Sequence, residues 1–145
     1  MTRARTDTGL LVLRLVVGLT FLLHGLDKLG GLSGVEQFFG SLGIPAPGLM
    51  ATVVAVTETA GGILLIVGLL TPLAGFALAI DMLVAGLTAH VDKGFFAGQG
   101  GYELVLVLGS ASVALLIAGA GRFSADALAL RGRQRPMWLR AIVQQ

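Results

Sequence analysis

The amino-acid sequence predicts an all-α integral membrane protein, a bundle of four transmembrane helices with a short interfacial helix between the first and the second. The first observation is composition, because 55% of the 145 residues are hydrophobic and only 12% are charged. The mean hydropathy of +0.90 lies well above that of soluble domains. The second observation is a set of four apolar runs, each close to the roughly 20 residues that cross a hydrocarbon core of about 30 Å. These runs are 10–27, 49–70, 73–90 and 102–120. We therefore expect one membrane domain, with no length left for a separate soluble catalytic domain.

The first span is preceded by residues 1–9, which we predict to be a short cytoplasmic tail. The run at 10–27 begins like a signal peptide, but Arg14 lies inside it and no small-residue cleavage site follows. We therefore expect an uncleaved helix. Residues 33–43 then place apolar side chains at helical spacing beside polar ones, which predicts the short interfacial helix. Two prolines break that helix before the second span begins.

The later spans are predicted to pack closely. Only the Thr71–Pro72 corner separates the second span from the third, which predicts an antiparallel hairpin. Small residues three or four positions apart let membrane helices approach each other, and the third and fourth spans each carry such a stripe. The two stripes, both predicted to face inward, are Ala74, Ala77, Asp81, Ala85 and Thr88, and Glu103, Val107, Ser110, Ala114 and Ala118.

The cations predict the orientation of the chain in the membrane. Seven arginines lie in the terminal segments, whereas the two long connections carry only Lys28 and Lys93. The positive-inside rule then places both termini in the cytoplasm. Residues 121–145 are predicted to be a basic cytoplasmic tail, either disordered or lying on anionic lipid. This topology explains the basic residues, so we expect the lipid bilayer and not nucleic acid as their partner.

Ionisable side chains inside a membrane mark functional sites by default, because a charge there is costly without a partner or a cavity. At about 1.5 Å per residue, helix position gives each group a rough depth. Glu58 lies near the midplane, Arg14 and Asp81 lie toward the cytoplasmic side, and the remaining groups lie toward the outer side. The candidate site residues are His24, Glu58, Arg14, Asp81, Lys28, Glu103 and His90.

Each of these residues also has a structural interpretation. Arg14 could extend to the cytoplasmic head groups, and Asp81 could be neutral and hydrogen-bonded. His90 and Glu103 could simply be hydrated side chains near the outer surface of the membrane. Gly61 and Gly62 either leave space beside Glu58 or allow close helix packing. The two histidines could ligate a haem, and together with Glu103 they could hold a metal ion, but nothing else in the sequence favours either, and we expect no metal.

Several stretches resemble the DoxX family of small bacterial four-helix membrane proteins. They are LRLVVGLTFLLHGLDKLGG, FFGSLGIPAP, VTETAGGILLIVGLLTPLAG, HVDKGFF and GYELVLVLGSASVALLIAGAGRFSAD. The similarity runs from about residue 10 to 126. Its most specific parts are His24, Gly25 and Lys28 at the end of the first span and Glu58, Gly61 and Gly62 in the second. The resemblance implies a four-helix fold in the inner membrane of a bacterial cell and a link to respiratory quinone chemistry or to oxidative-stress and quinone-resistance systems.

These expectations combine into a leading functional hypothesis, a quinone-associated accessory subunit of a membrane redox system. A pocket in the bundle would bind a quinone without a covalent bond. His24 and Glu58 would contact its oxygens, and Arg14 and Asp81 would form a supporting pair. The chain has no cysteine, so a soluble redox partner protein would supply the thiol or oxidant chemistry. The alternatives are a membrane scaffold for soluble redox enzymes and a small-molecule or proton transporter. Glycine-rich helix faces are also compatible with a homodimer.

Overall fold

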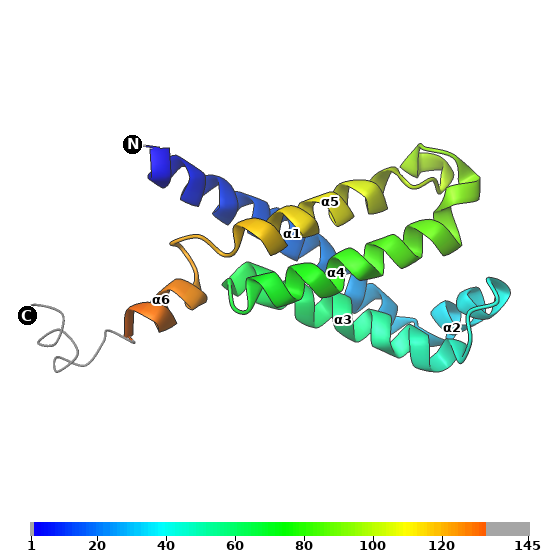
Figure 1. Cartoon of the computed structure of the whole chain (residues 1–145). Helices are drawn as coiled ribbons and strands as arrows, with labels where there is room; N and C mark the ends of the chain where they lie inside the picture. The colour runs from blue at the N-terminus through cyan, green and yellow to red at the C-terminus, as the bar shows by residue number, and fades with distance from the viewer. Residues whose placement is uncertain (1, 133–145) are drawn as a thin grey trace, which may run out of the picture.

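The computed structural model describes residues 2–132, and its regular elements are helical (Figure 1). The α-helices are α1 (Thr2–Gly30), α2 (Leu32–Ser41), α3 (Pro47–Val67), α4 (Thr71–Ala85), α5 (Glu103–Ala118) and α6 (Ala125–Gly132). The π-helical turn η1 (Gly86–His90) extends α4, and two short 3₁₀ turns, η2 (Val91–Lys93) and η3 (Ala97–Gln99), follow it. No strand occurs among the described residues. The all-α fold class is confirmed.

The helices differ in how well their lengths match a membrane. Three described helical stretches, Ala4–Gly30, Pro47–Val67 and Thr71–Lys93, are long and apolar enough to cross one. The fourth, α5, has 16 residues and a length of about 24 Å, which is shorter than the roughly 30 Å hydrocarbon core. Crossing by α5 therefore stays a prediction. A helix, α2, does occupy the region predicted at 33–43, and its position at the membrane surface also stays a prediction.

The two ends of the bundle are different in character (Figure 1). The start of α1, the corner between α3 and α4, and α6 lie at one end, which we call the α6 end. The connection between α4 and α5 lies at the opposite end with α2, and we call this the α2 end. The α6 helix occupies part of the segment predicted to be a basic tail. The rest of that tail, residues 133–145, lies outside the described residues.

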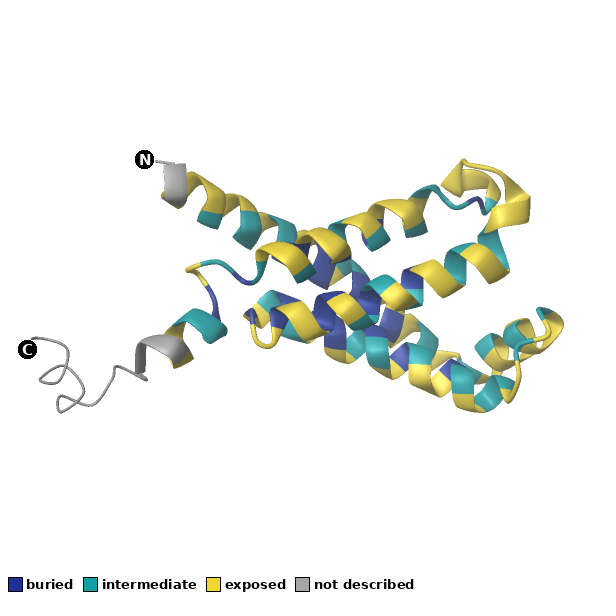
Figure 2. Cartoon of the chain, in the orientation of Figure 1, coloured by how far each residue is buried: buried dark blue, intermediate teal, exposed yellow. Residues whose placement is uncertain are grey.

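The burial pattern is that of a membrane bundle, with an apolar core and apolar side chains also on the outside (Figure 2). Phe21, Leu65, Leu78 and Leu115 are fully buried where the helices cross. Large apolar side chains such as that of Ile117, 79% exposed, cover the outer faces. Hydrocarbon can solvate these outer side chains, whereas water would not.

Glycines set the closest helix contact, which is between α1 and α3. A Cβ atom added at Gly62 would lie 2.6 Å from the Gly18 carbonyl oxygen, and one added at Gly25 would lie 2.5 Å from the Thr59 backbone nitrogen. A Cβ at Gly61 would meet Leu78 at 2.9 Å. The glycines beside Glu58 therefore serve close packing, one of the two interpretations that the sequence left open.

Replacing Gly62 by alanine is expected to lower the free energy of unfolding by about 1–3 kcal/mol, because the new methyl group would overlap backbone atoms of α1. Gly9→Ala is the matched control, since Gly9 lies in α1 with nothing within 4 Å of an added Cβ. The control should be neutral or slightly stabilising, because alanine favours helix more than glycine does. Denaturant titration in mild detergent measures both. Equal stabilities for the two variants would contradict the close contact.

The predicted inward stripe of α5 is wrong. Val107, Ser110, Ala114 and Ala118 are exposed, and the buried face of α5 consists of Leu108, Ser112 and Leu115. The contact with α4 forms where Gly75 meets the Ser112 carbonyl oxygen, 2.8 Å from an added Cβ. The α4 stripe is closer to the prediction, because Ala74 is buried and Asp81 is half-buried.

Candidate functional site

The centre of the candidate site is an ion pair between α1 and α3. The Lys28 ammonium nitrogen donates to Glu58 Oε2 at 2.6 Å. Glu58 is buried, and its side chain is 4% exposed, whereas that of Lys28 is 25% exposed. Lys28 lies in the last turn of α1, and its long side chain brings the charge to the middle of α3. A buried carboxylate is costly without a partner, and Lys28 gives Glu58 a direct cationic partner.

Asp81 on α4 adds a second acid to this pair. Its carboxyl group lies close enough to interact electrostatically with both Glu58 and Lys28. Its Oδ2 atom is buried and has no hydrogen-bond partner among the described residues. We call Lys28, Glu58 and Asp81 the acid–lysine cluster. It brings together three helices that are separate in the sequence.

The acid–lysine cluster is one positive charge short of neutrality. One lysine cannot neutralise two ionised carboxylates, and a net charge in a medium of low dielectric constant is costly. A proton on one of the two acids would make the cluster neutral, and a hydrogen-bond donor on a bound molecule would stabilise the carboxylate without changing its charge. Asp81 Oδ2 is the atom that lacks such a partner.

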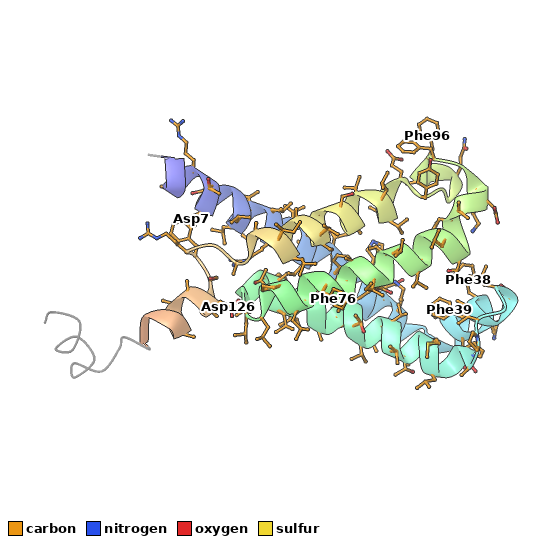
Figure 3. The ribbon with its side chains drawn as sticks, viewed as in Figure 1. Asp7, Phe38, Phe39, Phe76, Phe96 and Asp126 are labelled. Atoms are coloured by element: carbon orange, nitrogen blue, oxygen red, sulfur yellow. The ribbon has the colours of Figure 1, made fainter. Side chains whose placement is uncertain are left out.

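An open cavity of about 650 Å³ lies beside the cluster, between the end of α1 and α2. Lys28 is the member of the cluster that lines it. Its other lining residues are Leu26, Asp27, Gly30, Gly31, Gly34, Val35 and Phe38. Figure 3 shows Phe38 on α2, at the α2 end of the molecule. The Lys93 ammonium lies 5.7 Å from the centre of that ring, so a second cation stands close to the cavity. The volume is typical of small-molecule sites.

A second hollow, an apolar groove of about 720 Å³, lies between α4 and α5. It is lined by apolar side chains such as Phe76 and Leu83, and its polar groups are Tyr102 and Ser110. No member of the acid–lysine cluster lines it. It therefore offers a ligand apolar contact and two hydroxyl groups, but no carboxylate or ammonium group.

The structure does not bring His24 into the cluster. Its side chain is exposed on the outer face of α1, and no hydrogen bond joins it to another described residue. His24 and Lys28 are four residues apart and lie near the same helix face, but the longer lysine side chain reaches Glu58. Lys28 thus occupies the role beside Glu58 that the sequence suggested for His24.

Arg14 is also absent from the cluster, and the expected pair with Asp81 is not present. Arg14 is 1% exposed, so it does not extend to the head groups either. Its guanidinium donates to four backbone carbonyls, those of Leu65, Ile66, Ala120 and Phe123. The C-terminal carbonyls of α3 carry partial negative charge, which stabilises a cation at that position.

His90 and Glu103 stabilise the connection between α4 and α5. His90 Nδ1 lies 2.7 Å from the Gly100 carbonyl oxygen. Glu103 Oε2 accepts a hydrogen bond from the Ala97 backbone at 2.9 Å. Both residues lie in or beside a connection with mostly exposed residues, in agreement with the structural interpretation of each. Within residues 2–132, no three histidine, aspartate or glutamate side chains gather closely enough to hold a metal ion.

Two acids that sequence reasoning did not single out are important at the α6 end. Asp126 accepts hydrogen bonds from the backbone nitrogens of Leu70 and Thr71 at the start of α4. Asp7 accepts one from the backbone nitrogen of Arg122. Figure 3 shows Asp126 beside the start of α4 and Asp7 beside the segment that leads to α6. Sequence reasoning can recognise an aspartate that caps the helix directly after it. Asp126 and Asp7 instead bind backbone nitrogens that are distant in the sequence, so no local pattern identifies them.

Comparison with known proteins agrees with this architecture. The DoxX family model matches residues 9–91, which include most of α1, all of α2, α3 and α4, and the acid–lysine cluster. The chain is 34% identical to "Putative oxidoreductase CatD" of Bacillus subtilis over 88% of this chain and 92% of that protein. It is 28% identical to the inner membrane protein YqjF of Escherichia coli, over 84% of this chain and 92% of that protein.

A mycobacterial relative is similar over a comparable length. The chain is 32% identical to the uncharacterized membrane protein Rv3486 of Mycobacterium tuberculosis, over 87% of this chain and 84% of that protein. No solved structure matches the chain. The relatives named inner membrane proteins, together with the apolar helices, support a bacterial membrane location.

Proposed function

Because the chain belongs to the DoxX family of membrane proteins, we propose that it binds a quinone-like molecule at the acid–lysine cluster, as an accessory subunit of a membrane redox system. One observation carries this proposal. Lys28 is paired with buried Glu58, interacts electrostatically with Asp81, whose Oδ2 has no hydrogen-bond partner among the described residues, and lines a cavity large enough for an aromatic head group. The name of the Bacillus subtilis relative, which includes the word oxidoreductase, supports the same class of function.

The chemistry of the cluster suits both redox forms of such a molecule. A quinone ring carries carbonyl oxygens, which accept hydrogen bonds, and the Lys28 ammonium has two further donors besides the one used by Glu58. A quinol carries hydroxyl groups, which donate, and Asp81 Oδ2 is an acceptor without a partner. Apolar walls formed by Leu26, Val35 and Phe38 would contact the ring itself.

Electrons would come from outside this chain. The sequence has no cysteine, so no thiol of its own could pass electrons to the ring. We therefore propose a soluble redox partner protein as their source. The acid–lysine cluster would hold the ring and exchange protons with its oxygens, which is the role of general acids and bases in such reactions.

Substitution of Glu58 by glutamine tests the proposal. The wild-type protein in mild detergent should bind a decyl-substituted benzoquinone with one molecule per chain, as counted by native mass spectrometry. Glu58→Gln should weaken this binding about tenfold or more, because a charged hydrogen-bond partner of the site is worth about 1.5–3 kcal/mol. Asp81→Asn should act in the same direction. Thermal unfolding of each variant establishes that it is folded under the binding conditions.

His24→Gln is the matched control, because His24 lies on the same helix as Lys28 but faces outward. It should leave quinone binding unchanged. Normal binding by folded Glu58→Gln and Asp81→Asn would overturn the proposal. Loss of binding in His24→Gln alone would move the site to the outer face of α1, where the sequence had placed one of its members.

The two alternative functions receive no specific support from the described residues. The scaffold alternative depends on residues 129–145, most of which lie outside the described part of the chain. The transporter alternative requires flux of protons or small molecules through liposomes that contain the protein. The scaffold alternative does not explain why a lysine, a glutamate and an aspartate converge inside the bundle.

A further inference from the structure

The α6 end carries a surface that the quinone proposal does not use. It combines the exposed cations Arg5 and Arg122 with the exposed apolar side chains Phe123 and Leu128. We call these four residues the α6-end surface. Phe123 is 54% exposed and Leu128 is 67% exposed, and both lie in the segment that follows α5.

Hydrogen bonds hold this surface firmly on the bundle. Asp126 caps α4 through the backbone nitrogens of Leu70 and Thr71, and its own nitrogen donates to the Gly68 carbonyl at 3.0 Å. Arg14 donates to the Phe123 carbonyl at 3.0 Å. The Arg122 nitrogen donates to Asp7 at 3.0 Å. Because these bonds use backbone atoms, they leave the side chains of Phe123 and Arg122 directed outward.

At the α6 end, the acidic side chains have hydrogen-bond partners, whereas the arginine side chains of the surface have no acidic partner among the described residues. Asp7 and Asp126 are both engaged by backbone N–H groups. Within the part of the chain that the structure describes, no acidic side chain lies within 4 Å of the guanidinium of Arg5 or Arg122. The end is therefore suited to an anionic partner.

A lipid explains the apolar part of the surface as well as its charge. Cations next to exposed aromatic and leucine side chains are typical of segments that lie at the boundary between head groups and acyl chains. An acidic soluble protein would account for the arginines but would leave Phe123 and Leu128 facing water or requiring an apolar partner patch. The helices α1, α3 and α4, the last extended by η1 and η2, have their ends here and are long and apolar enough to cross a membrane, so a head-group layer would lie at this end.

We propose that the α6-end surface binds anionic phospholipid head groups, with Arg5 and Arg122 contacting the phosphates and Phe123 and Leu128 lying at the acyl-chain boundary. This inference is independent of the quinone proposal, because it concerns the opposite end of the bundle. It assigns a lipid preference to a surface built from four residues on two separate segments of the chain.

Native mass spectrometry of the full-length protein tests this inference. The detergent-solubilised protein is mixed with equal amounts of phosphatidylglycerol and phosphatidylcholine that carry the same acyl chains. The wild type should retain more phosphatidylglycerol. Arg5→Gln with Arg122→Gln should lower that preference by about fivefold for each arginine, and added salt should lower it in the wild type. Phe123→Ser should reduce the retention of both lipids.

Lys93→Gln is the control, because it removes one cation from the α2 end. It should leave the lipid preference unchanged. The inference is overturned by an unchanged preference in the double arginine variant, by an equal loss in Lys93→Gln, or by a wild type that retains both lipids equally. The last result would instead point to an acidic protein as the partner of the arginines. All four side chains are exposed, so these variants should keep the thermal stability of the wild type.

Discussion

Replacing Lys28 by methionine is expected to lower the free energy of unfolding by about 3 kcal/mol, at the low end of the range for breaking a buried ion pair because Lys28 is a quarter exposed. The variant leaves Glu58 and Asp81 close together with no cation. Two acids in an apolar interior cannot both remain ionised without a large cost. The stability loss therefore reflects the uncompensated acids more than the lost hydrogen bond.

The same charge count predicts a smaller effect for Glu58→Gln. That variant leaves Lys28 with Asp81, so one positive and one negative charge remain, and the expected loss is about 1–2 kcal/mol. The double variant Lys28→Met with Glu58→Gln leaves a single acid, and it should be more stable than the sum of the two losses implies. Denaturant titration of all four proteins in the same detergent gives the coupling energy.

Lys93→Met provides the matched control for this cycle. Lys93 lies in the exposed connection between α4 and α5, and its replacement should change stability by no more than about 0.5 kcal/mol. Additive losses from Lys28→Met and Glu58→Gln would show that the pair contributes no coupling. In that case the candidate site would need a different centre.

Replacing Arg14 by methionine is expected to lower the free energy of unfolding by about 3 kcal/mol or more and to release the segment between α5 and α6. Arg14 is 1% exposed and joins α3 to this segment through the carbonyls of Ala120 and Phe123. Methionine has no donor for these oxygens. Arg14→Lys should recover only part of the loss, because an ammonium lacks the planar set of five donors.

Hydrogen exchange locates the effect of the Arg14 variants. Backbone amides of residues 119–124 should exchange faster in Arg14→Met than in the wild type, while those of the connection at the α2 end should be unchanged. Arg5→Met, on the exposed side of the same helix, is the control and should leave exchange unchanged in both regions. Wild-type protection of residues 119–124 in Arg14→Met would contradict the role of Arg14 as the link between α3 and this segment.

Much of the fold follows from features that are local in the sequence. Apolar runs of membrane-spanning length predict the helices, and prolines and glycines mark their ends, as at the corner between α3 and α4. The last span is less well defined, because α5 ends at Ala118 and has only 16 residues. The sequence of α5 is apolar on every side, so it has no polar face that would indicate which side packs on α4. The stripe predicted to face inward is therefore found on the outer side of the helix.

The sequence also showed that Glu58 needs a partner, because a carboxylate inside an apolar helix is costly. It could not identify that partner. Depth along each helix places Arg14, His24 and Lys28 only along the membrane normal, and says nothing of rotation about the helix axis or of how far a side chain extends. Those two quantities decide the contacts, since Lys28 reaches Glu58 while His24, one turn earlier, faces outward.

By itself, then, the sequence determined a helical membrane protein with an acid that requires compensation. Only the tertiary structure decided that Lys28 and Asp81 meet Glu58, whereas Arg14 binds backbone carbonyls at the α6 end. The physical reason is that hydropathy and helix propensity act within one segment, whereas ion pairs and helix-end contacts depend on how separate helices are rotated against one another. Close packing at Gly18, Gly25 and Gly62 fixes that rotation between α1 and α3.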